Sequence, residues 1–370
     1  MTNKSRREFL AKVGLGSSIL SLSTMTSASS TQAAPVPVQQ DKKLGVALVG
    51  LGSYAEHQLA PALAQTKNCY LAGIVTGTPE KASKWKAKHN LKDANIYNYQ
   101  TFDKIADNKS IDIIYVVLPN AMHHEYVIRA AKAGKHVICE KPMAMSVKEC
   151  QEMIDACKKA GVKLSIGYRL HFEPFNQEAA RVGQKQEFGK VKLIESSFGF
   201  RAGDPTQWRL KKALAGGGAM MDVGIYAIQA ARYITGEEPT YVMAQEFKTD
   251  PVKFKDVDET ILWQMEFPGG AVSSHSTTYA SNVERLFLSA ETGWLQLAPA
   301  FGYGPLRGTT NKGELKLPIV NHQAMQLEDF ATCVLENRES SVSGEEGLKD
   351  MKVIEAIYRS IATGGKVKVS

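Results

Sequence analysis

A glycine-rich turn, placed between an apolar run and a helical segment, is the feature that most constrains the fold of this chain. Residues Leu44–Val49 form an uninterrupted apolar run, typical of a parallel strand buried on both faces, and the segment after it reads G-x-G-x-x-A. In that motif Gly50 allows a tight turn, Gly52 lets the backbone approach a pyrophosphate, and Ala55 keeps the following helix close to the strand. The helix N-terminus would direct free N–H groups at the phosphates. The sequence therefore predicts a dinucleotide-binding site formed by Gly50, Gly52, Ser53, Tyr54 and Ala55.

Strand and helix patterns alternate from residue 44 to residue 168 and then change character. The first part predicts βαβ units and a doubly wound parallel sheet, which is a Rossmann domain. From residue 169 to residue 370 the strand patterns alternate polar and apolar positions and follow one another directly, so an α+β domain with a large open, mostly antiparallel sheet is expected. At 370 residues the chain is long enough for both domains. One strand is expected to run over Leu286–Leu297, and two terminal helices, His322–Glu336 and Glu345–Thr363, are candidates to pack back onto the first domain.

The N-terminus resembles an export signal and is left out of the fold. Ser5–Leu10 contains two adjacent arginines before a weakly apolar stretch, and the small residues that follow end in Ala33-Ala34. This pattern predicts a twin-arginine signal peptide over residues 1–34, a short proline-bearing arm over residues 35–43, and a periplasmic location. The apolar stretch is about ten residues long, too short to span a bilayer, so no membrane association is expected after signal removal. A disordered basic N-terminus is the alternative.

Charge and cysteine content argue against several other classes of protein. The formal net charge is +7, but residues 1–34 contribute +3 of it, because they hold four Lys and Arg residues against one Glu. The remaining +4 is dispersed, without the basic run that is typical of nucleic-acid binding. The five cysteines show no C-x-x-C pair and no metal-ligand spacing, and are interpreted as small buried apolar residues. Neither a nucleic-acid partner nor a metal site is expected.

The end of the second strand indicates which dinucleotide is bound. An NAD site usually has an Asp or Glu there, which bonds the 2′-hydroxyl of the ribose. Here the strand ends in Val75-Thr76-Gly77-Thr78, followed by Lys81. A hydroxyl group and a cation can hold a 2′-phosphate, whereas Glu80 is expected beyond the turn, at the start of a helix. Thr76 and Lys81 therefore favour NADP, although Lys81 alone would also suit a solvated helix surface.

Three side chains of complementary chemistry are candidates for catalysis. Lys141 lies in Glu140-Lys141-Pro142, directly after an apolar strand, at the edge where ligands bind in open α/β sheets. Asp222 and Tyr226 are four residues apart at the start of a predicted helix, after the flexible run Gly216–Gly218, and therefore share one face. Carboxylate, phenol and ammonium groups suit the removal of a proton from a sugar hydroxyl, since a neighbouring Lys141 cation favours the phenolate form of Tyr226. The alternative is a structural tyrosine, with Asp222 as a helix cap.

Taken together, these motifs resemble the Gfo/Idh/MocA family of oxidoreductases, and within it glucose–fructose oxidoreductase. The likeness extends over residues 44–365, nearly all of the chain that follows the signal. The motifs that carry it are G-x-G-x-x-A at Gly50, Leu118-Pro119-Asn120 with His123, Glu140-Lys141-Pro142, Gly167-Tyr168-Arg169, Gln207-Trp208-Arg209, and Gly216–Gly218 followed by Asp222 and Tyr226.

The resemblance implies a role for each matching position. Tyr226 would be the general acid/base, Lys141 would orient the substrate and favour ionisation of the tyrosine, and Asp222 would bind the reacting sugar. Trp208 and Arg209 would lie at the edge of the substrate pocket. Further positions would contact the cofactor, namely Thr76, Lys81, Leu118, Pro119, Asn120, His123, Glu140, Lys141 and Arg169.

The implied activity is that of a sugar oxidoreductase with a tightly bound NADP. In a ping-pong cycle an aldose would be oxidised at C1 to a lactone, and a ketose or a second aldose would then be reduced to an alditol, in a homo-oligomer of two or four chains. Retention of the cofactor suits an exported enzyme, although residues 35–43 are shorter than the arm that covers the nucleotide in glucose–fructose oxidoreductase. An exported NAD-dependent glycosidase of the same fold and a non-catalytic sugar-binding protein are the alternatives.

Overall fold

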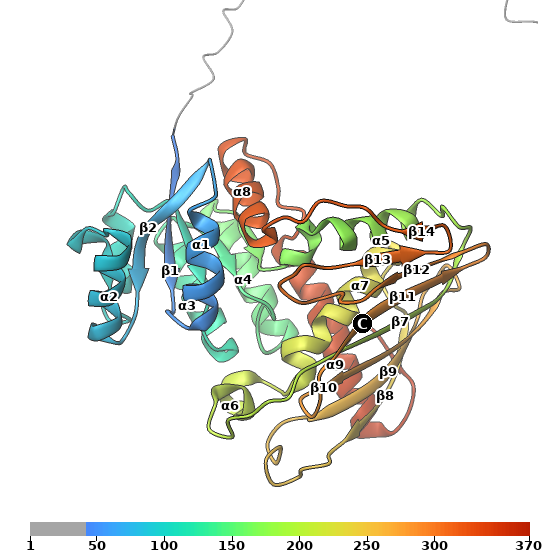
Figure 1. Ribbon diagram of the computed structural model, residues 1–370. Helices are drawn as coiled ribbons and strands as arrows, with labels where there is room; N and C mark the ends of the chain where they lie inside the picture. The colour runs from blue at the N-terminus through green and yellow to red at the C-terminus, as the bar shows by residue number, and fades with distance from the viewer. Residues whose placement is uncertain (1–41) are drawn as a thin grey trace, which may run out of the picture. The chain divides into compact units, whose positions relative to one another are not determined.

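Six short apolar strands form a parallel sheet in the first half of the computed structural model, which describes residues 42–370 (Figure 1). Successive residues of β1 pack on opposite faces, because Val46 and Leu48 join one apolar cluster and Ala47 and Val49 another. The strand order β3-β2-β1-β4-β5-β6 reverses between β1 and β4, which opens a ligand crevice at the carboxyl ends of these strands. The strands are β1 Leu44–Val49, β2 Cys69–Val75, β3 Ile96–Tyr97, β4 Ile113–Val116, β5 His136–Cys139 and β6 Leu164–Ile166.

Helices connect these parallel strands, as the alternation of patterns predicts. The glycine turn leads into a π-helical turn, Ala55–Leu59, that continues as α1. The side chain of Ser146 accepts a hydrogen bond from the Glu149 amide at 3.2 Å, which explains why α4 begins at the next residue. The connecting helices are α1 Ala60–Leu63, α2 Pro79–His89, α3 His123–Lys132 and α4 Val147–Ala160, with a 3-10 helix, Phe102–Asp107, between β3 and β4. Helix α5, Pro174–Gln184, leads from β6 to the second sheet.

A nine-stranded sheet forms the second half, in the order β14-β13-β12-β11-β7-β10-β9-β8-β15. Its pairs are antiparallel except for β7 with β10, which confirms the expected mostly antiparallel sheet. The expected strand over 286–297 is wrong, because the Ala290 amide bonds the Gly293 carbonyl at 2.9 Å and the chain reverses there. The strands are β7 Val191–Gly199, β8 Tyr241–Phe247, β9 Thr260–Glu266, β10 Val272–Thr278, β11 Val283–Ala290, β12 Trp294–Leu297, β13 Gly308–Thr310, β14 Gly313–Glu314 and β15 Val367–Lys368.

The C-terminal helices link the two sheets. Phe330 of α8 belongs to the apolar cluster that contains β1, and α9 packs against α4 and β6. Within the second half, Arg232 of α7 donates to Asp350 of α9 at 2.6 Å, and both side chains are almost fully buried. Residues 42–370 accordingly belong to one compact unit. These helices are α6 Lys212–Ala215, α7 Ile225–Thr235, α8 His322–Leu335 and α9 Gly344–Thr363.

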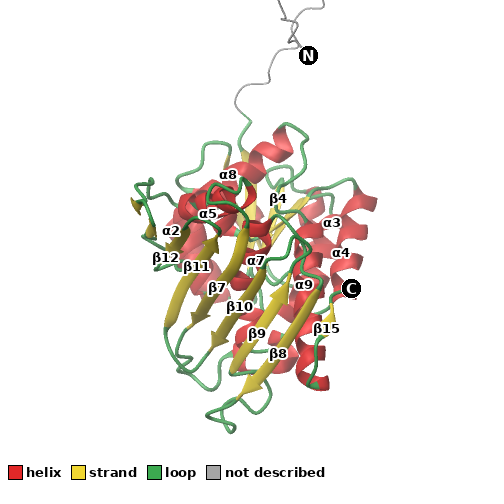
Figure 2. Cartoon of the chain, turned by 90° about the vertical axis from the view of Figure 1, so that its right-hand side faces the viewer, coloured by secondary structure: helices red, strands yellow, loops and turns green. Residues whose placement is uncertain are grey.

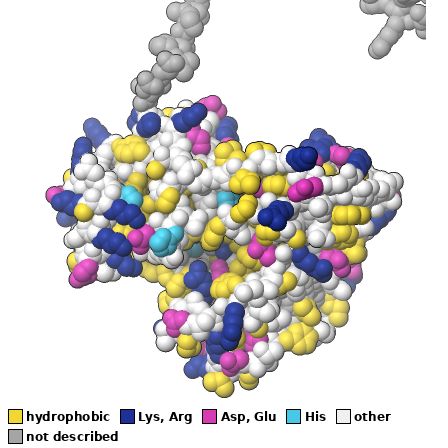
Figure 3. Space-filling view, in the orientation of Figure 1, with side chains coloured by type: hydrophobic (Ala, Val, Ile, Leu, Met, Phe, Trp, Pro, Cys, Tyr) yellow, Lys and Arg dark blue, Asp and Glu magenta, His cyan; other side chains and the backbone are white. Residues whose placement is uncertain are grey.

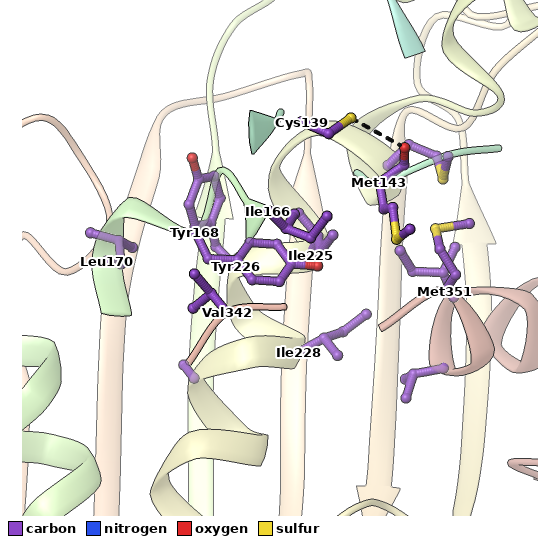
Figure 4. Packing of buried hydrophobic residues seen from close by; sticks show 14 of the residues in the cluster. Cys139, Met143, Ile166, Tyr168, Leu170, Ile225, Tyr226, Ile228, Val342 and Met351 are labelled. Atoms are coloured by element: carbon purple, nitrogen blue, oxygen red, sulfur yellow. Dashed lines mark hydrogen bonds between the residues drawn. The ribbon is translucent and has the colours of Figure 1, made fainter. Parts of the chain in front are cut away.

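The largest apolar cluster is shared by both halves of the chain. Figure 4 shows Tyr226 among side chains contributed by different elements, including Ile166 from β6, Ile228 from α7 and Met351 from α9. Because these side chains interlock, the position of Tyr226 depends on both sheets. All five cysteines are buried and unpaired, in agreement with their interpretation as small apolar residues.

One face of the nine-stranded sheet is left uncovered by residues 42–370. Figure 2 shows β8, β9, β10, β7 and β11 in front of the helices, with no helix of residues 42–370 on the near side. Large apolar side chains are exposed on three of these strands, where alternation turns them away from the core. They are Tyr241, Met243, Phe247, Leu262 and Val272.

The surface charge, the lengths of the helices and the N-terminus relate to the predictions about nucleic acid, membrane and export signal. On the face in Figure 3, Lys and Arg side chains are interspersed with Asp and Glu rather than gathered in one patch. No helix in residues 42–370 is long and apolar enough to cross a membrane. The signal predicted over residues 1–34, and nearly all of the arm predicted over residues 35–43, lie outside the described residues.

Candidate active site

The glycine turn after β1 has the geometry of a dinucleotide site. Gly50 adopts φ +98°, and a Cβ at this position would lie 2.6 Å from the Val117 carbonyl oxygen of the neighbouring segment. A Cβ on Gly52 would meet nothing within 4 Å, so the backbone is open to a ligand there. Within the described part of the chain, no side chain caps the helix that begins after this turn, and its first N–H groups are available to phosphate oxygens. Ser53 is exposed beside this opening, and Ala55 is buried against the sheet.

The end of β2 provides a hydroxyl group and a nearby cation, without a carboxylate. Thr76 is buried, and its Oγ1 accepts a hydrogen bond from the Thr78 amide at 3.3 Å. Lys81 donates from Nζ to the carbonyl of Leu51 at 3.2 Å, which places its ammonium group beside the glycine turn. Glu80 is exposed in the first turn of α2. These groups fit a nucleotide that has a phosphate on its ribose.

Lys141 joins the two halves of the site. It follows β5, and its Nζ donates to the Asp222 carbonyl oxygen at 2.5 Å and to the Asp222 carboxylate at 3.2 Å. The same ammonium nitrogen lies 4.7 Å from the centre of the Tyr226 ring. Burial disfavours the charged form of Lys141, but Tyr226 and Asp222 outweigh this effect and raise the pKa of the lysine. The three residues predicted to be catalytic are therefore brought together.

Asp222 is held as a carboxylate by three donors. Besides Lys141, Arg209 donates from Nε to Oδ2 at 2.9 Å and Tyr279 donates its hydroxyl to the same oxygen at 3.0 Å. Burial opposes ionisation of Asp222, but Lys141 and Arg209 outweigh it and lower its pKa below the usual range. Of the two predicted substrate-binding residues, Arg209 contacts this carboxylate directly, and the Trp208 ring centre lies 4.7 Å from the Arg209 guanidinium.

Tyr226 stands at the first turn of α7, directly after a π-helical turn, Met220–Gly224, that contains Asp222. The four-residue spacing of Asp222 and Tyr226 predicts that they share one face of an α-helix. In the structure Asp222 lies in a π-helical turn, which is wider than an α-helical turn. Both side chains nevertheless contact Lys141. The Tyr226 ring packs edge-on against Phe198 at 5.5 Å and lies 5.1 Å from the Arg169 guanidinium. The aromatic ring is thus flanked by two cations.

The predicted contact of His123 with the cofactor needs correction. His123 is fully buried, and its two ring nitrogens lie 2.9 Å from the carbonyl oxygens of Pro142 and Leu118. Its side chain therefore connects the loop that contains Leu118-Pro119-Asn120 to the loop that contains Lys141. Asn120, also buried, donates to the Ala215 carbonyl at 2.8 Å and connects the same region to α6.

Among the buried polar atoms that have no hydrogen-bond partner within residues 42–370, one is the Tyr54 hydroxyl in the glycine turn. Two others are Arg169 Nε, whose guanidinium lies beside the Tyr303 ring that stacks on Tyr54, and Gln326 Oε1. Gln326 also donates to the Tyr115 hydroxyl at 3.0 Å, which in turn donates to Glu140 at 2.7 Å. Buried polar groups are normally paired, so unpaired donors and acceptors at this place fit a polar ligand such as the amide of a nicotinamide ring. The residues present thus fit a bound dinucleotide.

Two positioning residues carry no sequence signal of their own. One is Tyr279, which bonds Asp222 from the end of β10. The other is Asp258, whose carboxylate accepts from the amides of Gly218 at 2.7 Å and Met220 at 2.8 Å and from the Tyr358 hydroxyl at 2.7 Å. A Cβ on Gly218 would lie 1.9 Å from the Asp258 carbonyl oxygen, which explains the glycine there.

Three family profiles match consecutive parts of this chain. An oxidoreductase family with an NAD-binding Rossmann fold matches residues 44–168, a GFO/IDH/MocA C-terminal domain matches residues 176–296, and an oxidoreductase-family C-terminal alpha/beta domain matches residues 309–369. The chain belongs to the Gfo/Idh/MocA oxidoreductases, and the resemblance seen in its motifs is confirmed.

Among proteins similar to this chain are several that act on sugars. The chain is 28% identical to an NADP(+)-dependent D-xylose 1-dehydrogenase of Haloarcula marismortui, over 89% of this chain and 94% of that protein. It is 31% identical to D-xylose 1-dehydrogenase (NADP(+)) 2 of Haloferax volcanii, over 73% of this chain and 84% of that protein. The structure of an aldose–aldose oxidoreductase from Caulobacter crescentus, complexed with glycerol, matches with 43% identity and a TM-score of 0.86, covering 88% of this chain and 100% of that chain. The chain therefore belongs to a family of sugar oxidoreductases with an NAD(P)-binding Rossmann domain.

Replacing Asp258 with Asn tests its positioning role. The variant keeps the size of the side chain but weakens the bonds that hold the helix start containing Asp222. We expect kcat to fall on the order of tenfold to a hundredfold, since small displacements of reacting groups have effects of this size. The free energy of unfolding should fall by about 1–3 kcal/mol. Asp256→Asn, an exposed change on the same loop, is the control. Unchanged turnover of Asp258→Asn would contradict the assignment.

Proposed function

We propose that this chain is an exported sugar oxidoreductase that transfers hydride between C1 of an aldose and a tightly bound NADP. The observation that carries the proposal is the contact of Lys141 with both Asp222 and Tyr226, at the carboxyl end of β5 and near the glycine turn. An acid/base group, a carboxylate and a cation at the crevice of a Rossmann sheet are what oxidation of a sugar hydroxyl requires.

The residues of the site would divide the chemistry as follows. When bound, NADP supplies the acceptor and later the donor of the hydride. The Tyr226 oxygen, as phenolate, accepts the proton of the C1 hydroxyl while the sugar becomes a lactone, and the Lys141 cation beside its ring stabilises the negative charge. In the second half of the cycle Tyr226 returns the proton to the carbonyl oxygen of the acceptor sugar. Asp222, kept ionised by Arg209 and Lys141, accepts a hydrogen bond from a sugar hydroxyl and orients the ring.

The proposal also specifies the cofactor, NADP, and a second sugar as the acceptor of the hydride. Thr76 and Lys81 offer partners to a 2′-phosphate where an NAD site has a carboxylate, and the two xylose dehydrogenases cited above are named for NADP(+). The similar Caulobacter protein is an aldose–aldose oxidoreductase, which favours an aldose as the acceptor here, with a ketose as the alternative. A periplasmic enzyme with the export signal proposed for residues 1–34 would need to retain its cofactor between the two half-reactions.

Absorbance at the reduced-nicotinamide band tests the activity directly. Extensively dialysed protein should show a stoichiometric rise when glucose is added without cofactor, and the rise should reverse when an acceptor sugar follows. Lys141→Ala and Tyr226→Phe should each reduce the rate at least about a hundredfold, the usual size of general acid–base catalysis. Lys148→Ala, an exposed lysine on α4, and Tyr233→Phe, a tyrosine on the same helix as Tyr226, are controls. Near-normal turnover in the two site variants would refute the mechanism.

The choice of cofactor can be tested at the end of β2. Thr76→Asp introduces a carboxylate that repels a 2′-phosphate and can bond a ribose hydroxyl. We expect the dissociation constant for NADP to rise on the order of a hundredfold relative to that for NAD, since placing like charges together costs several kcal/mol. Thr76→Ser is the conservative control. Identifying the nucleotide released on denaturation measures the same preference in wild-type protein, and release of NAD from the wild type would contradict it.

The uncovered face of the nine-stranded sheet is where we propose that a second copy of the chain docks. Its exposed apolar side chains on β8, β9 and β10 form a continuous region of adjacent strands, of a kind that monomeric proteins rarely leave in water. Strands β8 and β9 are paired, so exposed residues such as Met243 belong to one continuous surface. In a two-fold symmetric dimer, this surface would pack against the same surface of the second copy.

Charged substitutions on this face test the oligomer. Leu262→Glu and Met243→Glu, at positions each 45% exposed, place a carboxylate in the proposed contact and should convert the oligomer to monomers. Val252→Glu, at an 82% exposed position outside the sheet, should leave the mass unchanged. Light scattering after gel filtration measures the mass, and a wild-type protein that is already monomeric would contradict the proposal.

A further inference from the structure

The segment that connects β12 to β13 is held firmly at its base. Glu284 accepts hydrogen bonds from the amides of Phe301 at 2.6 Å and Gly302 at 2.5 Å. Arg169 donates to the carbonyl oxygens of the same two residues, Phe301 at 2.5 Å and Gly302 at 2.9 Å. Phe301 is fully buried. Two charged side chains therefore hold the backbone from which the next residue, Tyr303, extends.

Tyr303 extends from this base to the glycine turn of the other half of the site. Its ring is stacked on Tyr54 with 5.9 Å between the ring centres and an angle of 29° between the planes. The Arg169 guanidinium lies 4.6 Å from the Tyr303 ring centre and 5.1 Å from that of Tyr226. Although it makes these contacts, Tyr303 is 56% exposed. An aromatic residue this exposed contributes little to the core, and its aromatic and cation–π contacts are with Tyr54 and Arg169 at the cofactor crevice.

The stack borders the route that a bound dinucleotide is expected to take. Its phosphates would receive the N–H groups at the helix start that includes Tyr54, and its reactive ring would have to reach Lys141 and Tyr226. The Tyr54 hydroxyl and Arg169 Nε, both buried and without a partner in the described part of the chain, adjoin this route. Tyr303 would thus cover the nucleotide between its phosphates and its reactive end.

We propose that Tyr303 is the residue that retains the cofactor, by closing over the dinucleotide against Tyr54 and Arg169. The inference rests on the proposed function, in which one nucleotide serves both half-reactions. Arg169 contacts both Tyr303 and the Tyr226 ring, so the covering residue and the acid/base residue are positioned by the same guanidinium. Retention by Tyr303 makes a second sugar, rather than free nucleotide, the oxidant that restores the enzyme.

The rate at which NADPH leaves loaded protein tests this inference. Each variant is saturated with NADPH, and loss of its fluorescence is followed after mixing with excess NADP. We expect Tyr303→Ala to release the nucleotide on the order of tenfold to a hundredfold faster than wild type, because it loses an aromatic pair and a cation–π contact. Tyr303→Phe keeps the ring and should release it at the wild-type rate. Tyr70→Ala, at a tyrosine of β2 that is 40% exposed, is the control for loss of a surface ring.

The outcomes separate this inference from the proposed function. If Tyr303→Ala releases NADPH at the wild-type rate, Tyr303 does not retain the cofactor, whatever the activity of the protein. If wild-type protein contains no nucleotide after purification, the retained-cofactor cycle fails, while the release rates of loaded protein still decide the role of Tyr303. Thermal unfolding of each variant without nucleotide shows whether faster release reflects a damaged fold. If Tyr303→Ala unfolds at a lower temperature than wild type, Tyr303→Leu is used in its place, because it keeps an apolar side chain but has no ring. It should then release NADPH faster than wild type by the factor expected for Tyr303→Ala, and release at the wild-type rate would refute the inference.

Discussion

Lys141 and Asp222 are 81 residues apart in the chain, and the contact between them is the interaction on which the rest of the site depends. One ammonium group bonds both the backbone carbonyl and the carboxylate of Asp222, so it fixes the helix start of the second half against the end of β5. Neither charge would be stable alone in this buried position, because an unpaired buried charge is costly. Tyr226 lies beside the same ammonium group, and its chemistry therefore depends on this pair.

The sugar side and the cofactor side of the site differ in how many of their polar groups have hydrogen-bond partners. On the sugar side, Asp222 is bonded by Arg209 and Tyr279 as well as Lys141, and Asp258 holds the turn before it. On the cofactor side, the glycine turn is open and several buried polar atoms have no partner in residues 42–370. A preorganised site requires substrate-binding groups that are held rigidly by their neighbours. It also requires polar groups that are left unpaired, so that a cofactor can bond them.

Local patterns in the sequence predict much of this structure. The apolar run Leu44–Val49 and the glycines after it indicate a buried strand and a dinucleotide turn because each pattern reflects a local geometric need. The same patterns miss the reversal after Ala290 although Glu291-Thr292-Gly293 is a short polar run with a glycine, because the apolar residues on either side of it suit one continuous strand as well as a hairpin. They also mislead about His123, a residue type common in active sites, because its contacts with two backbone carbonyls become visible only when two loops meet.

The sequence by itself determined the alternation of strands and helices in the first half, the dinucleotide turn, the family, and the three side chains available for acid–base chemistry. These features depend on residues close together in the chain, where spacing and residue type set the geometry. Only the tertiary structure decided that Asp258 supports the turn containing Asp222, that His123 positions loops, and that Tyr303 reaches Tyr54. Each of these contacts joins segments far apart in the chain, and such segments become neighbours only when both sheets have packed around their shared core.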